Sequence, residues 1–208
     1  MKPPIFISFE GGEGSGKSTQ AELLHRRLKE RGVEAMLIRE PGSTPLGASL
    51  RTMLLGQKMD PRAELLLFLA ARAQLVTEVI HPALDRGVTV ISDRYADSSV
   101  AYQGYGRGLG AESVQELNRF ATHGLMPHFT FFLNVSPTTG LQRAAKRADP
   151  ANQRKFEEQA VSFHTLVHQG YLKLAAAEPK RWRVINGEQP VEAIQNAIWA
   201  ELTKVLDV

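Results

Sequence analysis

Hydrophobic residues gather into five short runs along the chain, and longer stretches with helical spacing lie between them. The runs cover residues 5–9, 33–38, 88–92, 129–135 and 182–185. Near-continuous apolar runs of this length are typical of strands that are buried on both faces of a sheet. Strands that alternate with helices favour a parallel sheet joined by right-handed crossovers. The pattern therefore predicts an α/β fold, with a five-stranded parallel sheet and helices on both faces.

The stretches between the runs predict helices, several of which begin or end at punctuating residues. They cover residues 18–31, 46–55, 61–85, 98–104, 112–122, 138–148, 156–177 and 191–205. Asp60 suits the N-cap of the third helix, and Pro61 suits its first turn. Residues 65–76 are apolar nearly all round, so we expect that helix to be central and buried. No repeat, linker or low-complexity segment divides the chain, so we expect one domain over residues 1–208.

Composition narrows the class of protein. The chain of 208 residues has a net charge of only +3 and no cysteine. This balance shows no nucleic-acid-binding tail, and the lack of cysteine excludes disulfides and thiolate metal sites. The six histidines show no metal-ligand spacing, and no apolar run approaches the length of a membrane span. Because residues 1–4 lack the layout of a signal peptide, we expect a cytoplasmic enzyme without a nucleic-acid or membrane partner.

Residues 11–18 carry the clearest chemistry in the chain. They read Gly-Gly-Glu-Gly-Ser-Gly-Lys-Ser between the first strand and the first helix, which fits G-x-x-x-x-G-K-[ST]. The glycines let backbone amides approach a polyphosphate, and the helix start favours an anion. Lys17 can reach the β- and γ-phosphates, and the Ser18 hydroxyl can bind Mg²⁺. A plain glycine-rich turn is the alternative, but the flanking strand and helix favour a phosphate-binding loop.

Charged residues follow two of the other predicted strands. Arg39 comes directly after the second strand, and Asp93 and Arg94 follow the third. Ligands bind at the carboxyl ends of strands in such sheets, and an acid beside a phosphate loop suits Mg²⁺. Arg94 would then clamp a phosphate group. The alternatives are a solvated loop charge for Arg39 and a helix N-cap or loop acid for Asp93.

Arg72 stands out in the apolar middle of the third helix, one turn after Phe68. A buried guanidinium is costly unless it is paired or hydrogen-bonded. An aromatic plane beside a planar set of donors suits a stacked and hydrogen-bonded base. The alternative is a core phenylalanine with an arginine that extends to water.

Basic residues also gather around the break at residues 148–153, which contains Pro150 and ends the helix predicted over residues 138–148. Five of them lie within residues 143–155: Arg143, Lys146, Arg147, Arg154 and Lys155. This composition predicts a short basic lid that closes on polyphosphate, and a solvated helix end is the alternative.

Five segments, taken in order, resemble the thymidylate kinase family, specifically its bacterial type. They are residues 9–18, 39–42, 67–72, 93–95 and 99–104. The similarity extends over essentially the whole chain, and the last three segments are more specific than the phosphate loop. The resemblance implies a P-loop kinase that converts ATP and dTMP into ADP and dTDP with Mg²⁺. It also implies a homodimer.

The resemblance further implies a site for dTMP. Phe68 stacks on thymine, and Arg72 hydrogen-bonds the carbonyl edge of the base. Ser99 and Gln103 complete the surroundings of the base. Tyr102 lies against the deoxyribose and disfavours a ribose 2′-OH.

The remaining implied roles concern the phosphates. Glu13 meets the sugar 3′-OH, Arg39 and Arg94 hold the monophosphate, and Ser18 and Asp93 serve Mg²⁺. The ATP-binding residues are Gly11, Gly12, Glu13, Gly14, Ser15, Gly16, Lys17, Ser18, Thr19 and Arg143, the last of which packs on adenine. The catalytic residues are Lys17, Arg39, Arg94, Arg147 and Arg154.

One departure concerns the phosphate loop, because some family members carry a catalytic arginine there and this loop has none. The lid residues Arg147 and Arg154 are then expected to supply that charge. Two other functions stay open. One is a kinase on the same scaffold with another nucleoside monophosphate or a deoxynucleoside as acceptor. The other is a nucleotide-binding switch without an acceptor, which would not require the basic lid.

Overall fold

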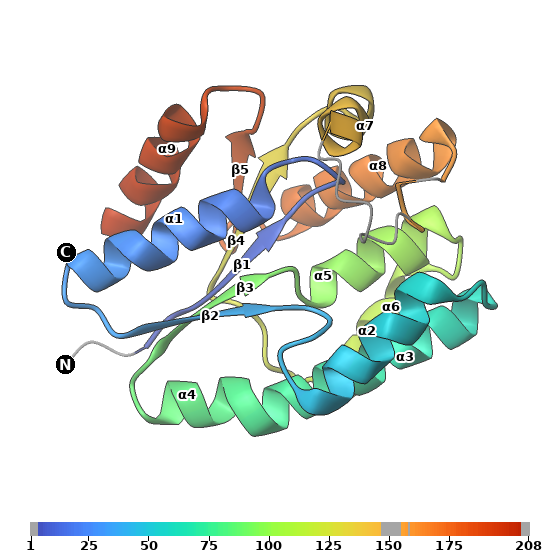
Figure 1. The fold of residues 1–208 in the computed structure, drawn as a ribbon, viewed down its shortest axis with the longest axis horizontal. Helices are drawn as coiled ribbons and strands as arrows, with labels where there is room; N and C mark the ends of the chain where they lie inside the picture. The colour runs from blue at the N-terminus through green and yellow to red at the C-terminus, as the bar shows by residue number, and fades with distance from the viewer. Residues whose placement is uncertain (1–3, 147–154, 158, 205–208) are drawn as a thin grey trace.

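The computed structural model describes residues 4–146, 155–157 and 159–204 of the chain. Within these residues, one sheet holds five parallel strands in the order β2-β3-β1-β4-β5 (Figure 1). The strands are β1 (Phe6–Glu10), β2 (Ala35–Arg39), β3 (Thr89–Asp93), β4 (Phe129–Asn134) and β5 (Trp182–Asn186). The predicted α/β fold is therefore confirmed, and each strand lies within two residues of its predicted run.

Helices cover both faces of the sheet, as predicted. Their bounds are α1 (Lys17–Glu30), α2 (Pro45–Gly56), α3 (Pro61–Leu75), η1 (Val76–Ile80), α4 (His81–Asp85), α5 (Ala96–Ser99), η2 (Val100–Gly106), α6 (Ala111–Ala121), α7 (Pro137–Lys146), α8 (Val161–Ala177) and α9 (Val191–Thr203). Successive side chains of β1 belong to different parts of the core, because a strand points successive residues to opposite faces of the sheet. Ile7 and Phe9 pack with α1 and α9, whereas Phe6 packs with η1 and α4 on the other face.

Three helix predictions differ from the structure. The helix expected over residues 61–85 contains the π-helical segment η1 between α3 and α4. It is not buried all round, because Leu66 of α3 is 58% exposed. The reason is that α3 packs against the helices α2 and α6, which do not enclose it on every side. The helix expected from residue 156 begins at Val161, and Phe156 lies in a turn before it.

The strand register brings the predicted site residues to one edge of the sheet. Asp93 at the end of β3 is paired with Phe9 of β1 on one side and with Arg39 of β2 on the other. The chain that leaves each of these strands therefore enters the same space. Among the described residues, no helix is both long and apolar enough to cross a membrane.

Candidate active site

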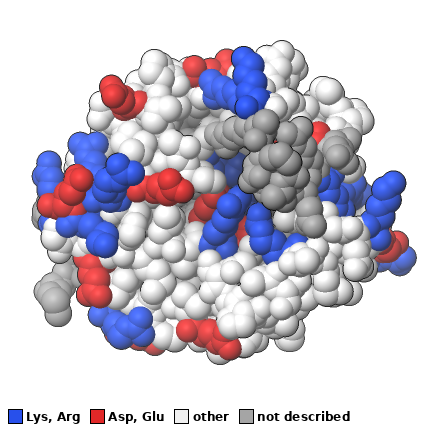
Figure 2. Space-filling model, viewed as in Figure 1, with Lys and Arg blue, Asp and Glu red and all other residues white. Residues whose placement is uncertain are grey.

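A cleft opens at the carboxyl edge of the sheet, where the phosphate loop, the end of β2, helices α2 and α3, and η2 meet. Its volume is about 1270 Å³, including its opening to solvent. Basic side chains gather near the middle of the face on which it opens (Figure 2).

The phosphate loop has the shape that its glycines predicted. Gly11, Gly14 and Gly16 have φ angles of 147°, 65° and 93°, a region that side chains rarely adopt. Gly14 also lies against α7, because a Cβ at this position would meet the carbonyl oxygen of Gly140 at 2.0 Å. Helix α1 begins at Lys17, so its amino end faces the cleft. A phosphate in the loop would meet this end of the helix dipole.

Lys17 lies inside the loop with its ammonium group held by the backbone. Its Nζ donates to the carbonyl oxygen of Gly12 at 2.7 Å and to Ser15 Oγ at 3.2 Å. Burial and the nearby positive charge of Arg94 lower the pKa of Lys17 to about 8. A polyphosphate beside Lys17 would favour its charged form.

Ser18 and Asp93 meet although they lie on different elements. The Ser18 hydroxyl donates to Asp93 Oδ2 at 2.5 Å. One hydroxyl oxygen and one carboxylate oxygen therefore lie together beside the loop. This donor set suits Mg²⁺, which binds oxygen ligands and usually takes only one or two of them from the protein. The predicted pair is thus brought together by the fold.

Arg94 is the centre of a polar cluster beneath the loop. Its backbone is left-handed, with a φ of 74°, which turns the side chain back over the sheet edge. Its guanidinium donates to the Gly11 carbonyl oxygen at 3.2 Å, to Glu13 Oε1 at 2.8 Å and to the Tyr102 hydroxyl at 3.2 Å. Burial alone would lower the pKa of Arg94, but Tyr102 and Glu13 raise it well above its usual value. Arg94 is therefore a fixed positive charge.

Glu13 is held by the same cluster. Its Oε1 accepts from the Tyr102 hydroxyl at 2.7 Å as well as from Arg94. Burial by itself would raise the pKa of Glu13, but Arg94 and Lys17 outweigh it and lower the pKa to about 2. The carboxylate is consequently ionised and ordered, ready to accept a further hydrogen bond.

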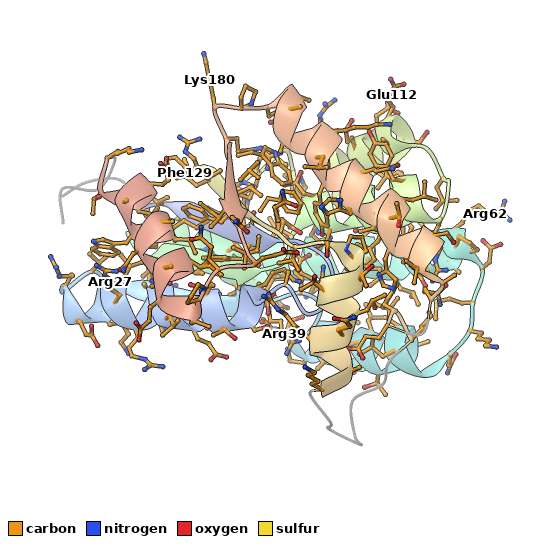
Figure 3. The ribbon with its side chains drawn as sticks, turned by 90° about the horizontal axis from the view of Figure 1, so that it is seen from above. Arg27, Arg39, Arg62, Glu112, Phe129 and Lys180 are labelled. Carbon is orange, nitrogen blue, oxygen red and sulfur yellow. The ribbon has the colours of Figure 1, made fainter. Side chains whose placement is uncertain are left out.

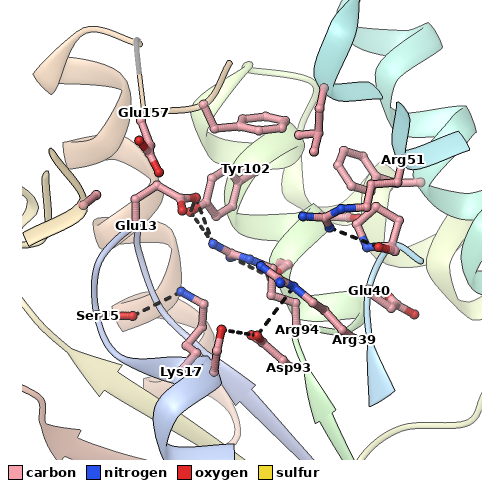
Figure 4. A pocket seen from close by; sticks show the side chains of 18 of the residues that line it. Glu13, Ser15, Lys17, Arg39, Glu40, Arg51, Asp93, Arg94, Tyr102 and Glu157 are labelled. Atoms are coloured by element: carbon pink, nitrogen blue, oxygen red, sulfur yellow. Dashed lines mark hydrogen bonds and ion pairs between the residues drawn. The ribbon is translucent and has the colours of Figure 1, made fainter. Parts of the chain in front are cut away.

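Two more arginines point into the same space as Arg94 (Figure 4). Arg39 is 61% exposed along its side chain, and its Nε lies 3.8 Å from Asp93 Oδ2. In the view from above, Arg39 lies over the middle of the molecule, whereas Arg62 and Lys180 extend outward (Figure 3). Arg51 of α2 lines the cleft and donates to the Pro41 carbonyl oxygen at 3.1 Å.

Sequence reasoning missed Arg51. Its only signal is a basic residue in the short helix after the Arg39 loop, which is equally typical of a solvated helix face. Burial lowers the pKa of Arg51, and the positive charge of Arg39 lowers it further. An anion between these two arginines would relieve this repulsion.

A deeper part of the cleft is lined by the four residues predicted around a base and by Tyr102, which was predicted against the deoxyribose. The four are Phe68, Arg72, Ser99 and Gln103. They come from α3, α5 and η2. Segments 27 or more residues apart thus meet where the sequence predicted a base pocket.

Arg72 is buried and does not extend to water, so that alternative is wrong. Its Nη2 lies 2.7 Å from Glu40 Oε2, and it donates to Glu40, Ser99, Asn118 and the carbonyl oxygen of Tyr95. Burial raises the pKa of Glu40, and Arg72 opposes this effect. Nearly all donors of Arg72 already have protein partners, so a hydrogen bond to a base would share one of them. Glu40 and Asn118 had not been predicted.

Some predicted residues lie elsewhere. Arg143 donates to the Gly187 carbonyl oxygen at 2.8 Å and does not line this cleft. Thr19 follows the loop on α1 and does not line it either. Arg147 and Arg154 lie outside the described residues, as does most of the predicted lid.

The fold and the cleft define a class of protein. A phosphate loop with its lysine, a Ser–Asp pair suited to Mg²⁺ and three arginines facing one space are the parts of a P-loop kinase that acts on a small phosphate-bearing acceptor.

Comparisons with known proteins define the family. A family model described as "Thymidylate kinase" matches residues 9–198. The thymidylate kinase of Deinococcus radiodurans is 45% identical over 206 residues, which cover 98% of each chain. That of Thermomicrobium roseum is 46% identical over 202 residues, 97% of this chain and 95% of its own. A crystal structure of thymidylate kinase from Ehrlichia chaffeensis aligns with a TM-score of 0.77 and 32% identity, over 97% of this chain and 99% of its own. The chain belongs to the thymidylate kinase family, whose members use ATP to phosphorylate dTMP.

Proposed function

We propose that the cleft binds ATP and dTMP with their phosphates facing each other, and that it transfers the γ-phosphoryl group to dTMP. The observation that carries this proposal is the space shared by Lys17 and the arginines 39, 51 and 94. Two polyanions repel each other, and a ring of cations offsets this repulsion while it stabilises the transferring group. A phosphate of dTMP would lie between the arginines, opposite the loop.

The acceptor needs little chemical activation. A phosphate oxygen of dTMP is already an anionic nucleophile, so it attacks the γ-phosphorus while the bond to the β-phosphate oxygen breaks and ADP leaves. No proton has to be removed from the nucleophile. The work of the protein is to align the two groups and to stabilise their charge. This favours a monophosphate acceptor over a nucleoside, whose hydroxyl would need a base.

We assign the deeper pocket to thymidine. Phe68 stacks on the base, and Gln103, Ser99 and Arg72 surround its polar edge. Tyr102 would lie against the deoxyribose. Support for a sugar contact by the loop comes from Glu13, whose ionised carboxylate is fixed by Tyr102 and Arg94 and can accept from the 3′-OH.

The ATP triphosphate is assigned to the loop residues 11–19, with Ser18 and Asp93 as the protein ligands of Mg²⁺. The bound ion would neutralise charge on the β- and γ-phosphates. Arg143 is proposed to pack on adenine. Arg147 and Arg154 are proposed to supply the charge that an arginine in the loop supplies in some relatives, which fits a lid spanning residues 143–155.

We also propose a homodimer. Leu66 of α3 and Phe120 of α6 are 58% and 85% exposed, and these two helices pack side by side. An isologous dimer would bury this apolar face against its copy. Phe120→Asp is expected to give a monomer by light scattering after gel filtration. Val191→Asp alters an apolar residue of α9 that is 50% exposed, and it should leave the mass unchanged. A dimer that persists in Phe120→Asp would refute this interface.

The function is tested by ADP release from ATP and Mg²⁺ with dTMP, dUMP, dCMP, UMP or thymidine as acceptor. We expect turnover with dTMP well above that with the others, and its loss in Lys17→Met. Turnover with thymidine, UMP or dCMP instead would keep the kinase and overturn the base pocket. ATP binding without any acceptor-dependent turnover would support the nucleotide switch.

A further inference from the structure

Glu64 of α3 is a buried carboxylate that has no role in the proposed phosphoryl transfer. It is 1% exposed, and it accepts hydrogen bonds from three residues on other elements. Gln103 Nε2 donates to its Oε1 at 3.0 Å, and Arg107 Nε does so at 3.2 Å. Lys155 Nζ lies 3.0 Å from its other oxygen, Oε2. Three segments therefore meet at this carboxylate, namely α3, η2 with the Arg107 that follows it, and the turn at Lys155, and η2 brings the proposed base contact.

The two cations keep Glu64 ionised. Burial alone would raise its pKa, but the hydrogen bonds from Gln103, Lys155 and Arg107 outweigh burial and lower the pKa. An ionised carboxylate only accepts hydrogen bonds. The amide nitrogen of Gln103, not its oxygen, must therefore face Glu64. A rotated amide would put two acceptor oxygens about 3 Å apart with no donor between them.

This contact leaves Gln103 Oε1 as the acceptor for a ligand. No other described residue donates to it, and Gln103 lines the cleft. Thymine and uracil present an N3–H donor beside the O4 acceptor, whereas cytosine presents an N3 acceptor beside an amino donor. A glutamine that could rotate freely would match either pattern. A glutamine held with its Oε1 toward the ligand matches the N3–H donor of thymine and uracil, but not the N3 acceptor of cytosine.

We propose that Glu64 is a positioning residue that holds the amide of Gln103 in the orientation that selects thymine and uracil over cytosine. This rests on the proposed role of Gln103 as a base contact. Arg107 and Lys155 hold Glu64 in place, so side chains that do not touch the base also contribute to its selection. Glu64 itself touches no substrate.

The test is Glu64→Gln, with kcat/KM measured for dTMP and dCMP. Lys155 and Arg107 would attract the oxygen of the new amide, which turns its nitrogen toward Gln103 and lets that amide rotate. We expect the ratio of kcat/KM for dTMP to that for dCMP to fall about tenfold or more, a change that one lost or mismatched hydrogen bond produces. The gain for dCMP should appear mainly in KM. Loss of folding stability alone would lower kcat/KM for both substrates and leave their ratio unchanged.

Asp97→Asn is the matched control. Asp97 is also a buried carboxylate, and it is paired with Arg181 at 2.6 Å, but it does not line this cleft. The ratio of kcat/KM for dTMP to that for dCMP in Asp97→Asn should equal that of the wild type. An equal fall in Asp97→Asn would overturn the proposal, because any buried charge would then have the same effect.

Gln103→Leu separates the proposed role of Glu64 from the proposed base contact of Gln103, on which it rests. If that variant keeps the wild-type ratio, the base contact by Gln103 is wrong. If it lowers the ratio while folded Glu64→Gln does not, only the role of Glu64 is refuted. Should Glu64→Gln fail to fold, the side-chain amide of Gln103 in the ¹⁵N-labelled wild type decides. One proton that exchanges slowly supports the fixed orientation, and two that exchange equally fast overturn it.

Discussion

Glu10 gives the sharpest prediction, because a buried acid at the end of β1 links stability to pH. It is fully buried, and it accepts from the Tyr95 backbone amide at 2.8 Å, from Ser98 Oγ at 2.6 Å and from the Tyr171 hydroxyl at 2.9 Å. Burial and the negative charge of Asp97 raise the pKa of Glu10 to about 7. Below that pH the folded protein carries a proton on this side chain.

The sign follows from where the proton sits. Between about pH 4.5 and 7 the folded state holds the proton and the unfolded chain has released it, so stability falls as pH rises through this window. A shift from 4.5 to about 7 contributes about 2–3 kcal/mol at pH 5 and almost nothing at pH 7.5. Glu10→Gln removes this term, because an amide resembles the protonated acid and cannot titrate.

The assay is urea unfolding of both proteins at pH 5, 6 and 7.5, followed by tryptophan fluorescence. The free energy of unfolding of the wild type, minus that of Glu10→Gln, should fall by about 2 kcal/mol between pH 5 and 7.5. Titrating groups that do not interact with Glu10 are common to both proteins and cancel in this difference. Glu22→Gln, at an exposed position of α1, controls for the loss of a surface charge. A difference for Glu10→Gln that does not change with pH would refute the reasoning.

Three further variants test the cleft. Lys17→Met should lower kcat by on the order of 10²–10³ in a folded protein, since the lysine acts on the transferring group, and an unchanged kcat in steady-state assays would exclude that role. Phe68→Ala should raise the KM for dTMP with little change in kcat, because stacking binds substrate and transition state alike; a normal KM would contradict the stack. Gly140→Ala would place a Cβ 2.3 Å from the Glu13 carbonyl oxygen, so α7 must move from the loop and ATP should bind more weakly by calorimetry, whereas unchanged affinity would show that the loop tolerates this shift.

The sequence by itself determined the features that depend on neighbouring residues. The strands follow from apolar runs, and the phosphate loop follows from glycines and a lysine at fixed spacing. Asp93 and Arg94 were located because a residue after a buried strand of a parallel sheet must emerge at its ligand-binding edge. The meeting of Ser18 with Asp93 then confirmed that two such local signals converge.

Only the tertiary structure decided which distant residues become partners. Arg72 could have extended to water, but Glu40 and Asn118, 32 and 46 residues away, hold it in the interior. Arg51 and Glu64 carry no local signal, because a charge on a helix is usually solvated. The packing of α2 places Arg51 at the cleft, and the packing of α3 places Glu64 behind it, against Gln103. The pKa of Glu10 is decided in the same way, since burial and the charges around a carboxyl exist only once separate segments have packed together.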